Sequence, residues 1–200
     1  MDIDKNLKKI RPFTAPPKQD YVNFVVPKLP LDIEIGCGVG LHPILYQGQH
    51  PERCLVALEH TKEKFDKFYR RFINHGSPEN LIPVHANGIS WVSQQLPNES
   101  VDQFFFLYPN PNPKPGDLNK RWYAMPFMQR VLEVLKKDGK ITLATNEGFY
   151  KDEALDYFIN HWKLKLVEKI HLDSSFKPRT HFEKKYLARG EACFNLVFSK

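Results

Sequence analysis

The sequence predicts an α/β fold of the Rossmann-like type, with a seven-stranded, mostly parallel sheet, an antiparallel edge strand and helices on both faces. Three observations predict it. Apolar and acidic residues alternate over 31–35, and this strand pattern runs into Gly36, Gly38 and Gly40 and then a helix-like segment. Strand-like and helix-like segments alternate through the rest of the chain. The run over 104–107 is continuously apolar, as in a central parallel strand covered on both faces.

Length and composition indicate one globular domain. The chain has 200 residues, of which 42% are apolar and 26% charged. No apolar run is long enough to span a membrane, and the N-terminus has no apolar signal core. The three cysteines are scattered and form no metal-ligand pattern. We therefore expect a cytoplasmic protein without a metal or a membrane partner, either a monomer or a weak homodimer.

Positive charge lies mainly at the two ends of the sequence. The formal net charge is +6; residues 1–30 carry six Lys/Arg against three Asp/Glu, and residues 163–200 carry nine against four. Basic flanks on a nucleotide-binding fold favour a polyanionic partner, most simply a nucleic acid. The alternative is that these lysines only keep the protein soluble.

We expect the elements in the following order. Residues 1–30 form an irregular basic arm, with a short helix over 4–10 and a strand or helix over 21–26. The predicted strands span 31–35, 54–58, 81–84, 101–107, 140–144, 163–171 and 192–198, and the last two pair antiparallel at one edge. The predicted helices span 41–47, 62–74 with Thr61 as its cap, 89–96, 119–137 with a possible kink at Pro126, and 150–161.

The glycine turn distinguishes between classes of nucleotide. A dinucleotide fingerprint requires G-x-G-x-x-G, but position 41 is Leu, so the spacing here is G-x-G-x-G, preceded by Glu34. That pattern resembles motif I of class I S-adenosylmethionine-dependent methyltransferases. The resemblance implies S-adenosylmethionine as the cofactor, with Glu34, Gly36, Gly38 and Gly40 at its site. Glu59, at the end of the second strand, suits the ribose hydroxyls, and its alternative is a surface acid.

Four further segments resemble bacterial tRNA (guanine-N7)-methyltransferases. Residues 108–114 with 119–121 resemble the family's F-P-D-P-W-x-K-x-x-x-x-K-R, 144–146 resemble A-T-D, 179–183 resemble T-K-F-E, and 189–190 resemble R-G. The likeness covers about residues 30–200, which would make 31–200 the methyltransferase domain. It implies a class I methyltransferase fold, transfer of a methyl group from S-adenosylmethionine, and a guanine of tRNA as the acceptor.

The resemblance also implies roles for individual residues. Its donor site falls on Glu34, Glu59, Asn87 and Asn110, with Asn110 at the reacting centre. Its acceptor site falls on Lys114, Asn146, Thr180, Phe182 and Glu183. Lys120 and Arg121 are candidates for a backbone phosphate.

Each of these assignments has a structural alternative. Asn87 suits a turn before Gly88, and Lys114 suits an exposed loop. Glu183 suits an ion pair with Lys184 or Arg179, and Phe182 is favoured as a core residue over a stacking platform.

The chain differs from the family in the same way at three positions. Asn87, Asn110 and Asn146 stand where the family has Asp, so three negative charges are absent. Guanine N7 attacks with its own lone pair and becomes cationic, so one nearby carboxylate is worth up to about 4 kcal/mol at 4 Å and an effective dielectric constant near 20. Three hypotheses remain open: an active RNA guanine methyltransferase, which we favour; a donor- and RNA-binding protein without turnover; and a methyltransferase of another nucleobase position.

Overall fold

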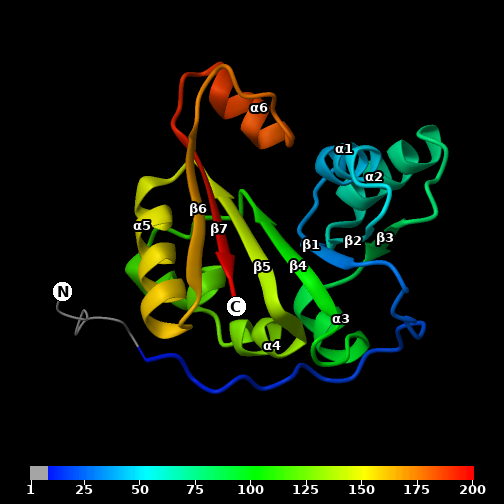
Figure 1. The fold of residues 1–200 in the computed structure, drawn as a ribbon, viewed down its shortest axis with the longest axis horizontal. Helices are drawn as coiled ribbons and strands as arrows, with labels where there is room; N and C mark the ends of the chain where they lie inside the picture. Colours follow the sequence, from blue (N-terminus) through cyan, green and yellow to red (C-terminus); the bar gives the residue numbers. More distant parts are fainter. Residues whose placement is uncertain (1–8) are drawn as a thin grey trace.

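One seven-stranded sheet organises the molecule. A computed structural model describes residues 9–200, so the helix expected over 4–10 lies mostly outside the described residues. The strand order is β3-β2-β1-β4-β5-β7-β6. The strands are β1 (Leu31–Ile35), β2 (Cys54–Glu59), β3 (Leu81–His85), β4 (Val101–Leu107), β5 (Leu135–Thr145), β6 (Lys165–Leu172) and β7 (Cys193–Ser199). Strands β1 to β5 are parallel, and β7 runs antiparallel between β5 and β6, which confirms the predicted fold class (Figure 1).

Helices cover both faces because the side chains of each strand alternate between two cores. Ile33, Val56 and Phe104 belong to one core, and Leu55, Ala57 and Phe105 to the other. The first core lies under α3, α4 and α5, and the second under α1, α2 and α6. The helices are α1 (Leu41–Gln49), α2 (Lys62–Asn74), α3 (Gly88–Gln95), α4 (Phe127–Val134), α5 (Gly148–Asp156), which continues as the π-helical turn η3 (Tyr157–His161), and α6 (His181–Ala188).

The strand order places the candidate site. Strand β1 lies between β2 and β4, so the connections that leave β1 and β4 turn to opposite faces of the sheet. In open α/β sheets the ligand lies beyond the carboxyl ends of the strands at such a switch point. Here the glycine turn after β1 (residues 36–40) and the proline-rich loop after β4 (residues 109–116) both lie at that edge.

The connection from β4 to β5 differs from its prediction. A single helix over 119–137 was expected, and this is wrong. The segment forms two 3₁₀ turns, η1 (Pro115–Lys120) and η2 (Trp122–Ala124), followed by α4, and β5 already begins at Leu135. Pro126 starts α4 instead of kinking it, because Met125 before it is extended (ψ 141°), as residues before proline prefer.

Two helix starts also differ from expectation. Helix α6 was not predicted, although Thr180-His181-Phe182-Glu183 matches a capping pattern; the Thr180 hydroxyl oxygen accepts a hydrogen bond from the Glu183 amide at 3.0 Å. Thr61 was expected to cap α2 with its side chain, but it makes no such bond. Instead its amide donates to Glu59 Oε1 at 2.7 Å, so the acid that ends β2 also holds the start of α2.

Residues 9–30 form an arm along the outside of α4 and α3 (Figure 1). The arm contains no helix or strand, so neither form expected over 21–26 is present. Phe13 packs edge-on against Phe127 and Phe24 against Trp91, while glutamine side chains of α3 and α4 accept hydrogen bonds from the arm's backbone amides. Among the described residues, every helix is too short or too polar to cross a lipid bilayer.

Candidate active site

The turn after β1 is built from three glycines in a left-handed conformation. Gly36, Gly38 and Gly40 have φ of 81°, 60° and 75°, a region that side chains disfavour. The Gly36 and Cys37 amides both donate to the carbonyl of Leu58, at 2.8 and 3.0 Å, which ties the turn to the end of β2.

The glycines serve two different purposes. A Cβ at Gly36 or Gly38 would meet no atom within 4 Å, so the backbone borders open space at these two positions. A Cβ at Gly40 would lie 1.9 Å from the ring of Phe68, so α2 packs against the main chain there. Gly36 and Gly38 thus face open space, and Gly40 faces the core.

Glu59 is buried against the glycine turn. Its Oε2 accepts a hydrogen bond from the Gly38 amide at 2.9 Å, and Oε1 takes the Thr61 amide. It also lines a pocket of about 240 Å³ whose apolar walls are Ile35, Leu58, Ile89 and Trp122. Each carboxylate oxygen has two lone pairs, so Glu59 can accept two further hydrogen bonds from hydroxyls in that pocket.

Asn87 lies on the same pocket but uses its side chain as a helix cap. Its Oδ1 accepts from the amides of Ile89 at 3.0 Å and Ser90 at 3.2 Å. Both lone pairs of that oxygen are occupied, so it is not free to accept a further hydrogen bond from a bound molecule. The Nδ2 hydrogens remain as donors toward the pocket.

Glu34 is buried under α1 and pairs with a histidine of that helix. Its Oε2 lies 2.8 Å from Nδ1 of His42, and both side chains are about 95% covered. Glu34 and Glu59 also surround the thiol of Cys37. Burial, followed by these two negative charges, raises the pKa of Cys37 well above its usual value, so the thiol stays protonated.

Arg121 binds the backbone of the proline-rich loop. The guanidinium is buried, donates to the carbonyls of Asn112 at 3.0 Å and of Pro113 and Lys114 at 3.2 Å, and pairs with Glu153. Arg121 was a candidate for a backbone phosphate, and the structure instead uses it to shape the loop. Lys120 pairs with Asp117 at 2.8 Å and stays exposed.

Asn110 is exposed at the tip of this segment. Its Oδ1 accepts from the Asn112 amide at 3.3 Å, and its carbonyl accepts from the Asn112 side chain at 3.0 Å. Lys114 is also exposed. The loop therefore presents an amide and an ammonium group on a rigid backbone.

Hydrogen bonds to the buried carboxylate of Glu183 join α6 to the end of β4. Tyr108, in a left-handed conformation (φ 51°), donates its hydroxyl to Glu183 Oε1 at 2.9 Å. Arg179 donates to the same oxygen at 2.7 Å. Burial favours the neutral acid, but the bonds from Arg179 and Tyr108 outweigh it, and the pKa of Glu183 is lowered. The alternative named for Glu183, a pair with Arg179, is therefore present.

Phe182 is 44% exposed and is not a core residue, contrary to the favoured expectation. Its ring stacks near Tyr186 at 6.1 Å between centroids, and Tyr186 lies 5.7 Å from Tyr108. This aromatic run leads from the surface of α6 to the proline-rich loop, a geometry that suits base stacking.

Asn146 follows β5 at the same edge. Its Nδ2 donates to Glu191 Oε2 at 3.2 Å and to Glu147 Oε1 at 3.5 Å.

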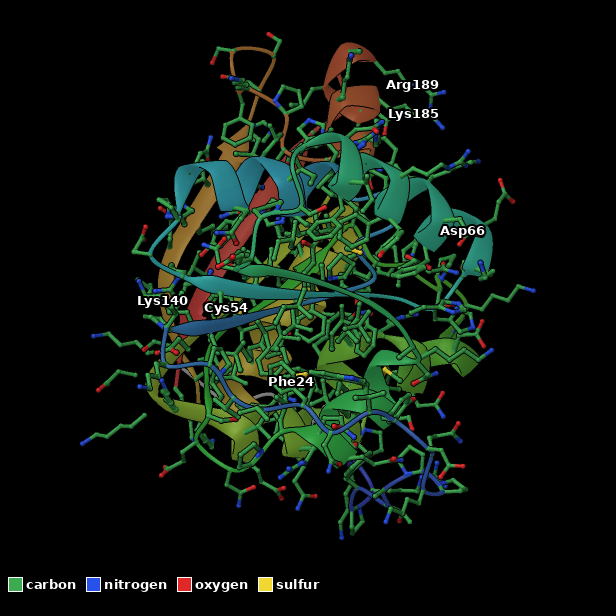
Figure 2. The ribbon with its side chains drawn as sticks, turned by 90° about the vertical axis from the view of Figure 1, so that its right-hand side faces the viewer. Phe24, Cys54, Asp66, Lys140, Lys185 and Arg189 are labelled. Atoms are coloured by element: carbon green, nitrogen blue, oxygen red, sulfur yellow. The ribbon has the colours of Figure 1, made fainter. Side chains whose placement is uncertain are left out.

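Thr180, the cap of α6, keeps its hydroxyl hydrogen available. Lys185 and Arg189 project from α6 into solvent (Figure 2).

Sequence reasoning missed several side chains that build this edge. Tyr108 also holds Glu183, Glu191 and Glu147 hold Asn146, and His42 holds Glu34. The capping pattern at 180–183 was an available signal for α6. Two of these pairs, Tyr108 with Glu183 and Glu191 with Asn146, join residues 75 and 45 positions apart.

Comparison with known proteins agrees with this geometry. A family model described as "Putative methyltransferase" matches residues 28–196. A tRNA (guanine-N(7)-)-methyltransferase from Bartonella quintana is 28% identical over 173 residues, covering 84% of this chain and 74% of the relative. A protein of the same name from Thermotoga maritima is 26% identical over 186 residues, covering 87% of this chain and 59% of the relative.

Solved structures show the same fold at low identity. The 16S rRNA methyltransferase KamB has a TM-score of 0.62 at 17% identity, covering 85% of this chain and 87% of that one. A SAM-dependent methyltransferase from Aquifex aeolicus has a TM-score of 0.55 at 12% identity, covering 84% and 81%. With a family model that spans 28–196 and a seven-stranded sheet of the class I order, the chain belongs to this family of methyltransferases.

Proposed function

We propose that the protein transfers a methyl group from S-adenosylmethionine to N7 of a guanine in tRNA. The observation that carries the proposal is the open space at Gly36 and Gly38, next to Glu59 and at the same edge of the sheet as the proline-rich loop. The names of the relatives and the basic charge of the chain support the RNA substrate.

The residues present fit the cofactor. The pocket of about 240 Å³ has apolar walls for a purine and the Glu59 carboxylate for ribose hydroxyls. Gly36 and Gly38 let the remainder of the molecule approach the main chain. When bound, S-adenosylmethionine supplies a methyl group made electrophilic by its sulfonium.

The chain's own residues then have defined tasks. Glu59 holds the ribose, the loop shaped by Arg121 presents Asn110 at the reacting edge, and the run from Phe182 to Tyr108 offers a stacking surface. N7 has a lone pair and no proton, so its attack needs no general base; the new carbon–nitrogen bond forms as the carbon–sulfur bond breaks. Catalysis then depends on holding the two partners in line.

The test uses the full chain, unmodified tRNA and radiolabelled S-adenosylmethionine. We expect label in the tRNA and chain cleavage at 7-methylguanine at one position. Label without cleavage at 7-methylguanine would mean another base position and would overturn the N7 assignment. Binding of both partners without label would identify a donor- and RNA-binding protein instead.

A further inference from the structure

The amide of Asn146 is oriented by two carboxylates from different parts of the chain. Glu147 follows it directly, and Glu191 lies just before β7, 45 residues later. Ionised carboxylates only accept hydrogen bonds, so the group that faces them at 3.2 and 3.5 Å is the amino group of the amide. The oxygen of Asn146 is therefore turned away from both acids.

That oxygen has no protein partner. Within residues 9–200, no donor lies at hydrogen-bond distance from Asn146 Oδ1. It lies at the carboxyl end of β5, where Ala144 pairs with Leu107 of β4, next to the start of the proline-rich loop. Toward a ligand, Asn146 thus presents what an aspartate would present, an acceptor.

The two acids also restore negative charge beside the amide. Glu191 is opposed by Arg189 at 3.6 Å, a pair more than a third exposed and therefore weak. Glu147 and Glu191 also lie near the Tyr186 hydroxyl; burial first, and then their charges, raise its pKa. Glu147 and Glu191 thus supply, beside Asn146, the negative charge that an aspartate at position 146 would carry.

We propose that Glu191 and Glu147 are positioning residues, which hold Asn146 so that its oxygen accepts the N1 and N2 hydrogens of the acceptor guanine and which supply negative charge near the cationic product. This rests on the proposed function. Guanine carries donors at N1 and N2, whereas N1 of adenine is an acceptor, so an oriented oxygen selects guanine. An aspartate at 146 would instead place a third carboxylate against the other two.

The first measurement tests the amide orientation without any substrate. Urea unfolding at pH 7 compares the wild-type protein with N146D, E191Q and N146D/E191Q. We expect N146D to lower the unfolding midpoint, and to lower it much less when Glu191 is already Gln, because the repulsion is then reduced. If N146D lowered the midpoint by the same amount with and without E191Q, the proposed orientation of the Asn146 amide would be wrong.

The second measurement tests the role in methyl transfer, under single-turnover conditions with saturating S-adenosylmethionine. We expect E191Q to lower the rate about tenfold, with unchanged binding of S-adenosylmethionine by calorimetry, and N146D/E191Q to recover most of that loss. A merely structural role for Glu191 would leave the double variant as slow as E191Q, which would overturn the proposal.

The matched control is E133Q. Glu133 on α4 also faces an arginine, Arg130 at 3.1 Å, and a side-chain amide, Gln129 at 3.4 Å, but it lies before β5, at the opposite end of that strand from Asn146. We expect its rate to equal that of the wild-type protein; an equal loss in E133Q and E191Q would contradict the assignment. If the wild-type protein does not methylate tRNA while the unfolding cycle is non-additive, the proposed function fails and the amide orientation stands.

Discussion

The carboxylate of Glu59 accepts a hydrogen bond from the amide of Gly38 at 2.9 Å. This bond joins the end of β2 to the turn after β1, so one acid both shapes the glycine turn and borders the pocket beside it. A change at Glu59 therefore alters both the turn and the lining of the pocket in which we propose that the donor binds.

We expect E59A to lower the affinity for S-adenosylmethionine at least about tenfold, because a hydrogen bond to a charged group contributes about 1.5–3 kcal/mol. Isothermal titration calorimetry measures it. E52A is the control, since Glu52 is an exposed acid before the same strand. Equal affinities for E59A and E52A would remove Glu59 from the donor site.

Replacing Gly38 by leucine should abolish binding of S-adenosylmethionine while the protein stays folded. The side chain would enter the open space in front of the turn. Gly76 offers a matched control, because it too has a positive φ (82°) and open space at its Cβ, but lies after α2. G76L should show a similar loss of thermal stability and bind the cofactor normally; lost binding in both variants would point to strain instead of occlusion.

R121A should lower the rate of methyl transfer without weakening tRNA binding. Arg121 is buried and holds three loop carbonyls, so its loss frees the loop and leaves those acceptors without a donor. We expect a stability loss of at least about 2 kcal/mol by urea unfolding. K120A, next to it and exposed, should keep stability and lose only tRNA affinity. If R121A weakened tRNA binding and K120A did not, Arg121 would again be the candidate for binding a backbone phosphate.

N110D should raise the rate constant for methyl transfer. Asp can still accept from the Asn112 amide at this exposed position, and its charge favours the cationic guanine product. We expect an increase of about tenfold, which corresponds to about 1.4 kcal/mol. N119D adds the same charge at another exposed asparagine of the loop region and should change the rate little. An unchanged rate in N110D would contradict the electrostatic account.

The contribution of Glu183 to stability should disappear in acid. Its pKa is lowered on folding, so its stabilising effect is complete above the usual carboxyl pKa of 4.5 and is lost as the pH falls through the lower, folded value. The difference in unfolding free energy between the wild-type protein and E183Q should be largest at pH 7 and shrink below pH 4.5. It should also largely persist in 0.5 M salt, because the Glu183 carboxylate is fully buried; a difference that salt removes would contradict this.

Much of the fold was predictable because strands β1 and β4 carry strong local patterns. Alternation over 31–35 and the apolar run over 104–107 fix two central strands, and the glycines after Ile35 fix the connection. The segment 119–137 was misassigned because its apolar spacing suits a helix, whereas Pro126 and the extended residues Arg121 and Met125 divide it. The spacing of apolar residues alone does not reveal such breaks.

Only those parts of the site that carry a sequence motif were predictable. The positions of Glu59, Asn110 and Asn146 at the carboxyl edge follow from the strand order. The partners that fix their side chains do not, because Glu191 with Asn146 and Tyr108 with Glu183 are pairs separated by 45 and 75 residues. Such pairs form only when the whole sheet is assembled.

Among residues 9–200, strand β6 pairs only with β7, and β7 also pairs with the other side of β5 from β4. A shortened protein without residues 193–199 would leave two strands with unpaired backbone groups, the usual starting point for edge-to-edge aggregation. The half of the sheet around Gly38 and Glu59 pairs through β1 to β4 and does not depend on that strand. The part of the sheet that bears the glycine turn and the part that bears α6 therefore have unequal tolerance to damage at β7.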